Sequence, residues 1–240
     1  MWLTSTENGF TPDISKVERL KDTLKKRISR ISKLAITSNP QCDKTVNGLF
    51  IVECKDLKKI YVSRKVIYFG QRRMKDDHSA PSRSYLKIEE AFSIFNHSPG
   101  NCESVVDLGA APGGWTWAAL KRGATVYAID NGPLKNGPLN HPNVHHFRQD
   151  AYAWQPDTPV DWLFCDMVDQ PTKVFELIYK WFSNRWCRFA IVNFKYGYSD
   201  PVKIIDLLYS RKGLLPFSKK MICRHLYHDR DEITIMVEIH

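Results

Sequence analysis

Apolar positions near the front of the chain repeat at helical spacing. Within residues 16–34 they lie three or four residues apart, at Val17, Leu20, Leu24, Ile28, Ile31 and Leu34. Lysines and arginines lie between them. The pattern predicts an amphipathic helix with a basic outer face, which either packs on a neighbouring element or contacts a polyanion directly.

The next apolar segments are shorter. Residues 48–52 and 60–69 are apolar or β-branched and predict two short strands. Residues 70–83 are polar and rich in helix- and strand-breaking residues, which is typical of a domain boundary. We therefore expect a small basic extension over residues 1–78 and a second domain over residues 79–240.

From Ser84 onward, helical and strand-like patterns alternate along the chain. Helices are expected from about Ser84 and over residues 114–122, 171–184 and 200–210. Pro171 and Pro201 suit a first helical turn, and Asp200 suits an N-cap. Strands are expected over residues 104–108, 125–130, 144–148, 161–166, 188–194, 220–227 and 231–239, with the polar turn 228–230 joining the last two. The alternation predicts an α/β fold with a doubly wound, mostly parallel sheet.

Positive charge is concentrated in the first third of the chain. Residues 1–87 hold 19 lysines and arginines against 9 acidic residues, whereas residues 88–240 hold 16 against 17. A basic segment joined to a neutral domain suits a protein that holds a polyanion such as RNA with one part and processes it with the other. A solvated surface face would give the same distribution.

Cysteine usage and the first residues bear on the compartment. The six cysteines form no C-x-x-C pair, which argues against a zinc site or a disulfide framework. The first residues lack a basic region followed by an apolar core, and no apolar run approaches the roughly 18 residues of a membrane span. We expect a cytoplasmic protein without a metal centre.

The most specific motif is a strand that ends in a glycine-rich loop and opens into a helix, over residues 105–115 (VVDLGAAPGGW). Glycines allow a ligand to approach the backbone, and a helix N-terminus favours an anionic group such as a carboxylate. A dinucleotide loop would have a second glycine where Ala111 stands. The form G-x-x-P-G-G-W is instead that of an S-adenosylmethionine loop, with expected contacts from Asp107, Gly109, Ala111, Pro112, Gly113, Gly114 and Trp115.

Two acids follow the next two strands. Asp130 comes 21 residues after Gly109, the spacing at which an acid accepts the ribose hydroxyls of an adenosyl group, and Asn131 follows it. Asp150 is a candidate acceptor for the adenine amino group, with Ala151 against the ring. Acids at strand ends are also common as helix caps, so both interpretations stay open at this point.

The fourth and fifth strands of this domain end in opposite charges. Asp166 closes one strand and Lys195 closes the other. A lysine at the end of a buried strand needs a partner, and Asp166 is the natural one if the two strands are neighbours. Such a pair could deprotonate a hydroxyl that attacks a methyl group, or it could be a structural salt bridge.

From about residue 80 to 240 the chain resembles the FtsJ-type RNA ribose 2′-O-methyltransferases. The resemblance rests on residues 82–87 (SRSYLK), 107–115, 130–133 (DNGP), 165–168 (CDMV), 193–195 (NFK) and 227–232 (YHDRDE), in the family's order. It implies a Rossmann-like methyltransferase domain with an antiparallel last strand. It also implies S-adenosylmethionine as cofactor, S-adenosylhomocysteine as product and RNA, in the first place ribosomal RNA, as partner.

The resemblance also implies a catalytic tetrad. The family's Lys-Asp-Lys-Glu set falls on Lys87, Asp166, Lys195 and Glu232, with Lys195 as the base toward the 2′-hydroxyl and Asp166 also beside the cofactor. Glu238 competes with Glu232, because it lies on the same face of the same expected strand.

The front of the chain departs from this pattern. Family members that modify large-subunit ribosomal RNA carry a larger RNA-binding module of the THUMP type, for which 80 residues are too few. A cap or transfer-RNA ribose is therefore an alternative target, and a non-catalytic RNA-binding relative is a second alternative. Methylation of adenine N6 or cytosine C5 is disfavoured, because the Asn/Asp-Pro-Pro-Tyr run and the Pro-Cys nucleophile are absent from the sequence.

Overall fold

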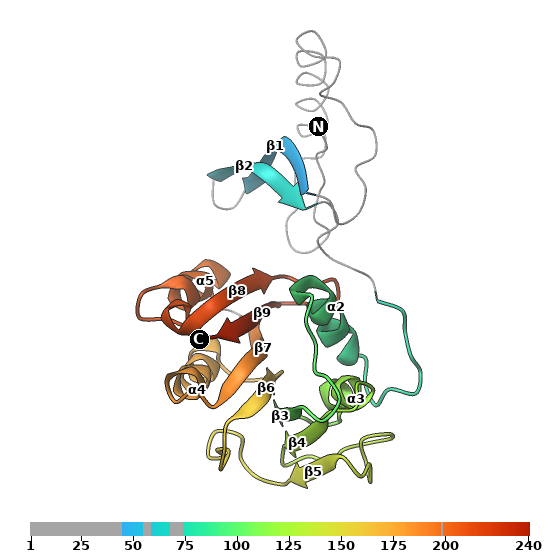
Figure 1. Ribbon diagram of the computed structural model, residues 1–240. Helices are drawn as coiled ribbons and strands as arrows, with labels where there is room; N and C mark the ends of the chain where they lie inside the picture. Colours follow the sequence, from blue (N-terminus) through green and yellow to red (C-terminus); the bar gives the residue numbers. More distant parts are fainter. Residues whose placement is uncertain (1–44, 55–58, 68–73, 198) are drawn as a thin grey trace. The chain divides into compact units, whose positions relative to one another are not determined.

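The structure is a computed structural model that describes residues 45–54, 59–67, 74–197 and 199–240 (Figure 1). The chain divides into two units, Met1–Gly70 and Gln71–His240. The helix expected over residues 16–34 lies outside the described residues. In the first unit, β1 (Thr45–Cys54) and β2 (Lys59–Ile67) form an antiparallel hairpin where the sequence predicts strands over residues 48–52 and 60–69, and β1 is longer than predicted.

The second unit is built on a seven-stranded sheet with the order β5-β4-β3-β6-β7-β9-β8. Its strands are β3 (Ser104–Leu108), β4 (Thr125–Ile129), β5 (Val144–Phe147), β6 (Val160–Cys165), β7 (Cys187–Lys195), β8 (Ser218–Arg224) and β9 (Glu232–Ile239). The first five run parallel, and β9 is antiparallel to both of its neighbours. The predicted fold class is confirmed, including the antiparallel last strand.

Four α-helices and a short 3₁₀ helix complete the described part of this unit: α2 (Tyr85–Phe95), α3 (Gly114–Leu120), α4 (Pro171–Ser183), α5 (Pro201–Tyr209) and η2 (Leu215–Phe217). Proline occupies the first turn of α4 and of α5. The Asp200 carboxylate accepts a hydrogen bond from the Val202 amide at 2.9 Å, so the expected cap is formed. None of the described helices is long and apolar enough to cross a membrane.

Helices cover both faces of the sheet. Strand residues alternate between two apolar cores, as the period of a strand requires. One core contains Leu163 with Ile178 and Trp181 of α4, and the other contains Trp162 with Phe92 of α2. The central strands are therefore buried on both faces, whereas β5 and β8 at the two edges stay partly exposed.

Candidate active site

The carboxyl edge of the sheet collects most of the predicted site residues. Strands β3, β4, β6 and β7 are parallel, so the loops that follow them meet at this edge. Strand β9 runs the other way and therefore begins there. Its first residue, Glu232, pairs in register with Lys195 at the end of β7.

Four of these side chains form a line of alternating charges. Lys195 Nζ lies 2.6 Å from Asp166 Oδ1, and Lys87 Nζ lies 3.7 Å from the same oxygen. Lys87 Nζ also lies 2.5 Å from Glu232 Oε1. All four side chains are at most 21% exposed. At that degree of burial an unpaired charge would be costly, so each charge needs the next one in the line.

Lys195 also holds the loop after β6. Its ammonium group donates to the Asp166 carbonyl at 2.7 Å and to the Met167 carbonyl at 3.2 Å, in addition to the carboxylate. An ammonium group has three protons, so these three acceptors occupy all of them. A substrate hydroxyl that bonds to Lys195 must therefore take the place of one of these three acceptors.

The two candidate glutamates of β9 have different surroundings. Glu232 is buried against Lys87, whereas Glu238 pairs with the exposed Lys219 at 2.6 Å. Glu232 is at the start of β9, at the carboxyl edge of the sheet, and Glu238 is near the other end of the strand. Although both side chains lie on the same face of β9, only Glu232 is near the charge cluster. Only Glu232 joins Lys87, Asp166 and Lys195.

Two buried acids behind the cluster were not singled out from the sequence. Glu90 lies on α2, one turn after Lys87, and is fully buried. Asp229 belongs to the turn before β9, and it accepts hydrogen bonds from Leu226 N, Thr234 Oγ1 and Asn193 Nδ2. Burial raises the pKa of Asp229 to about 6, and the charge of Glu232 adds to this. The sequence shows only a polar turn at residues 228–230, because a buried acid and an exposed one look alike in a sequence.

The glycines of the loop over residues 109–115 make room for protein and not only for a ligand. A Cβ on Gly109 would lie 2.7 Å from Met167 Cγ, and one on Gly113 would lie 3.0 Å from Pro138 Cγ. A Cβ on Gly114 would overlap Ser84 Oγ, at the start of α2. These glycines therefore also let neighbouring segments pack against the loop, and their role in the approach of a ligand stays a prediction.

Trp115 also differs from the expectation. Its side chain is buried in the core under α2, and its indole N–H donates to the Ser84 carbonyl at 3.0 Å. A ligand in the loop could therefore reach Trp115 only through its main chain.

Asp107 is a buried carboxylate with one oxygen in use. Its Oδ2 accepts a hydrogen bond from Thr116 Oγ1 at 2.6 Å, while Oδ1 is buried without a hydrogen-bond partner. Burial raises the pKa of Asp107 to about 7, although the bond from Thr116 opposes this. A carboxylate oxygen left in this state is suited to a cationic donor that arrives with a ligand.

Asp130 follows β4 and binds its own loop. Its two carboxylate oxygens accept hydrogen bonds from Ala111 N at 3.0 Å and from Gly132 N at 2.7 Å. The first of these bonds joins the loop after β4 to the loop after β3. Each oxygen keeps a further lone pair, so the carboxylate can still accept from a diol. Asn131, beside it, is exposed.

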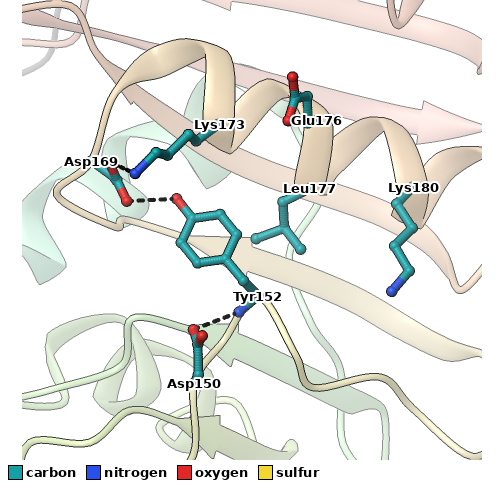
Figure 2. Close-up of a pocket in the computed structure, with 7 residues that line it drawn as sticks. All are labelled: Asp150, Tyr152, Asp169, Lys173, Glu176, Leu177 and Lys180. Atoms are coloured by element: carbon teal, nitrogen blue, oxygen red, sulfur yellow. Dashed lines mark hydrogen bonds and ion pairs between the residues drawn. The ribbon is translucent and has the colours of Figure 1, made fainter.

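Asp150 lies at the rim of an open cavity of about 510 Å³ between the loop after β5 and α4 (Figure 2). Its Oδ1 accepts a hydrogen bond from Tyr152 N at 3.0 Å, and Ala151 between them is buried. The Tyr152 ring points toward the loop before α4, where its hydroxyl donates to Asp169 Oδ2 at 3.1 Å (Figure 2). Asp150 is exposed and follows the edge strand β5, which is separated from β7 by three strands.

Comparison with known proteins identifies relatives for this site. Residues 80–184 match the model of the FtsJ-like methyltransferase family. The chain is 42% identical over 179 residues to ribosomal RNA large subunit methyltransferase M of Laribacter hongkongensis, which covers 69% of this chain and 50% of that protein. It is 43% identical over 169 residues to the protein of the same name from Halorhodospira halophila, covering 69% and 49%. The chain thus spans about half the length of the curated relatives it matches.

Solved structures agree on the fold. A Streptococcus thermophilus protein that carries the name hemolysin superposes with a TM-score of 0.53 at 17% identity, over 79% of this chain and 78% of that one. At this level of identity the similarity concerns the arrangement of strands and helices alone.

Proposed function

This chain belongs to the FtsJ-like methyltransferase family through residues 80–184, and from that premise we propose that it transfers a methyl group from S-adenosylmethionine to a ribose 2′-hydroxyl of RNA. The observation that carries the proposal is the charge cluster of Lys87, Asp166, Lys195 and Glu232. It places two ammonium groups and two carboxylates at the edge where the 109–115 loop begins. A non-catalytic relative would have no need to keep four charges buried.

The residues around the loop fit the cofactor chemically. S-adenosylmethionine carries an amino acid ammonium group, a ribose diol and an adenine, and when bound it supplies an electrophilic methyl group. The free, buried Oδ1 of Asp107 suits the ammonium group, and the spare lone pairs of Asp130 suit the diol. Asp150 and Ala151 are the candidates for the adenine. Gly109, Ala111, Pro112, Gly113, Gly114 and Asn131 contribute main chain beside it.

The chain's own residues handle the proton of the hydroxyl. Attack of the 2′-oxygen on the methyl carbon forms a C–O bond as the C–S bond breaks, and the hydroxyl proton must leave. Lys195, once neutral, can accept that proton. Asp166 holds Lys195 at the site through their ion pair, and Lys87 links Asp166 to Glu232.

The RNA is proposed from two observations. Residues 1–87 carry the excess positive charge of the chain, which suits phosphate contacts by the extension over residues 1–78. The curated relatives are named for large-subunit ribosomal RNA. We therefore expect ribosomal RNA as the substrate, bound by the extension and modified by the domain over residues 79–240.

Methyl transfer from labelled S-adenosylmethionine tests the proposal. Unmodified transcripts of large-subunit ribosomal RNA, total transfer RNA and capped messenger RNA would be offered separately. We expect the label to appear in ribosomal RNA. We also expect that RNA to resist alkaline cleavage at one nucleotide, because a 2′-O-methyl group blocks cleavage there. Label on a base, or no transfer to any RNA, would contradict the proposal, and label in transfer RNA or a cap would change the substrate alone.

A further inference from the structure

Exposed large apolar side chains of the described part of the second unit fall into three groups, one of which is Leu139 alone, on the loop after β4. Tyr179, Val202, Ile205, Tyr209 and Leu215 lie on helices α4, α5 and η2, away from the charge cluster. Val168 and Tyr227 lie on the two loops that border the end of β7. Val168 comes two residues after Asp166, and Tyr227 comes five residues before Glu232. Since β7 lies between β6 and β9, these loops flank Lys195.

Tyr227 has an aromatic ring, which Val168 lacks, and it is 47% exposed. Packing gives no reason for a tyrosine at this position, because about half of its surface faces solvent. Its main chain, in contrast, is held firmly. Tyr227 N donates to the fully buried Glu90 carboxylate at 2.8 Å.

The residues on either side of Tyr227 are fixed as well. Leu226 is fully buried, and its amide donates to Asp229 Oδ2 at 2.8 Å. The Arg230 amide donates to Glu232 Oε1 at 3.2 Å. The loop is therefore attached to α2, which carries Lys87, and to the first residue of β9. Its position follows that of the charge cluster.

The Tyr227 ring is oriented by its neighbour. The His228 ring meets it edge to face, with centroids 4.9 Å apart and planes at 74°. A rigid loop that presents an oriented, half-exposed ring loses little conformational entropy when a flat ligand stacks on it. Nucleobases splayed out of an RNA strand are recognised by stacking on aromatic side chains in this way.

We propose that Tyr227 is the stacking platform for the base of the nucleotide whose ribose is methylated. The inference rests on the proposed function, because it takes the ribose to lie at Lys195 and the base to lie beside it. It adds that the substrate nucleotide is unpaired when it reacts, since a base within a duplex has no free face for the ring.

Substitutions at position 227 separate stacking from packing. Tyr227→Phe keeps the ring, Tyr227→Leu keeps apolar volume without a ring, and Tyr227→Ala removes both. Tyr209→Ala, on α5, is the matched control for loss of an exposed tyrosine. The measurements are kcat/KM for an unmodified large-subunit ribosomal RNA transcript, the affinity for S-adenosylmethionine, and Tm.

We expect Tyr227→Ala and Tyr227→Leu to lower kcat/KM for RNA by roughly 10- to 100-fold, the usual effect of losing one stacked base. Tyr227→Phe and Tyr209→Ala should stay close to wild type, and cofactor affinity should be unchanged in all four. A leucine variant as active as the phenylalanine variant would show a packing role and overturn the inference. So would an alanine variant with normal kcat/KM. Failure of the wild-type protein to methylate any RNA would instead overturn the proposed function, and the inference with it.

Discussion

At the scale of single residues, the buried Asp107 makes the stability of the fold, and binding at the proposed cofactor loop, depend on pH. Burial raises its pKa to about 7, whereas the same carboxyl group titrates near its ordinary value of 3.8 in an unfolded chain. The folded protein therefore binds more protons than the unfolded one between these values. Its free energy of unfolding should fall as pH rises from about 4 to about 7.

This shift predicts a proton release on cofactor binding. An ammonium group against Oδ1 favours the ionised carboxylate, so binding below pH 7 must expel the Asp107 proton. Affinity for S-adenosylmethionine should weaken as pH falls from 8 to 6. Calorimetry in two buffers of different ionisation heat measures the proton directly. Asp107→Asn should bind weakly with no such release, and a release that persisted in this variant would assign it to another group.

Lys195 is the second residue whose chemistry is testable alone. As the base it must lose a proton, which a guanidinium group cannot do. Lys195→Ala and Lys195→Arg should both lower kcat by roughly 100- to 10,000-fold while cofactor affinity survives. The control is Lys219→Ala, which breaks the exposed ion pair with Glu238 at the same 2.6 Å distance. An arginine variant with near-normal turnover would mean that a fixed positive charge suffices at this position.

At the scale of elements, the cluster depends on how α2 meets α3. Gly114 begins α3 with no space for a side chain, because the Ser84 hydroxyl fills it and Ser82 Oγ would lie 2.5 Å from a Cβ. The indole of Trp115 binds the Ser84 carbonyl. Helix α2, which begins beside this contact between Ser84 and Gly114, carries Lys87.

Gly114→Ala should therefore damage both stability and activity. Forcing a methyl group into this contact should lower the free energy of unfolding by about 1–3 kcal/mol. It should also lower kcat, because α2 moves Lys87 away from Asp166. Gly100→Ala is the control, since its Cβ would meet nothing closer than a Glu103 oxygen at 3.8 Å. Thermal unfolding and methyl transfer would be measured on both variants, and a Gly114→Ala protein as stable as wild type would refute the close contact.

Elements of this domain could largely be predicted from the sequence, because proline, caps and apolar periodicity act locally. The Asp200 cap and the prolines of α4 and α5 lie where those signals place them. The burial of Asp229 and Glu90 could not be predicted, since it arises when α2 and the turn before β9 meet across more than 130 residues. For the same reason, the ion pair of Glu232 with Lys87 and the close packing of Ser84 against Gly114 are seen only in the fold.

At the scale of the whole molecule, the excess positive charge lies in the first third of the chain. The segment over residues 1–40 holds 8 lysines and arginines against 4 acidic residues. Its removal should weaken binding to ribosomal RNA and make that binding less sensitive to salt, because fewer counterions are released. Cofactor affinity should not change. Filter binding over a series of salt concentrations measures this, and an unchanged salt slope would exclude phosphate contacts from these residues.

The position of β9 in the sheet also sets the order in which the site can be made. This strand lies between β7 and β8 yet follows both in the chain, so β8 has no place in the sheet until β9 arrives. During synthesis, the cofactor loop and the Asp166–Lys195 pair can therefore be complete while Lys87 still lacks Glu232. Under the proposed function, a nascent chain that has not yet reached residue 232 has the residues expected to hold the methyl donor but lacks the last member of the charge cluster. The proposed activating group is therefore complete only once β9 has paired with β7.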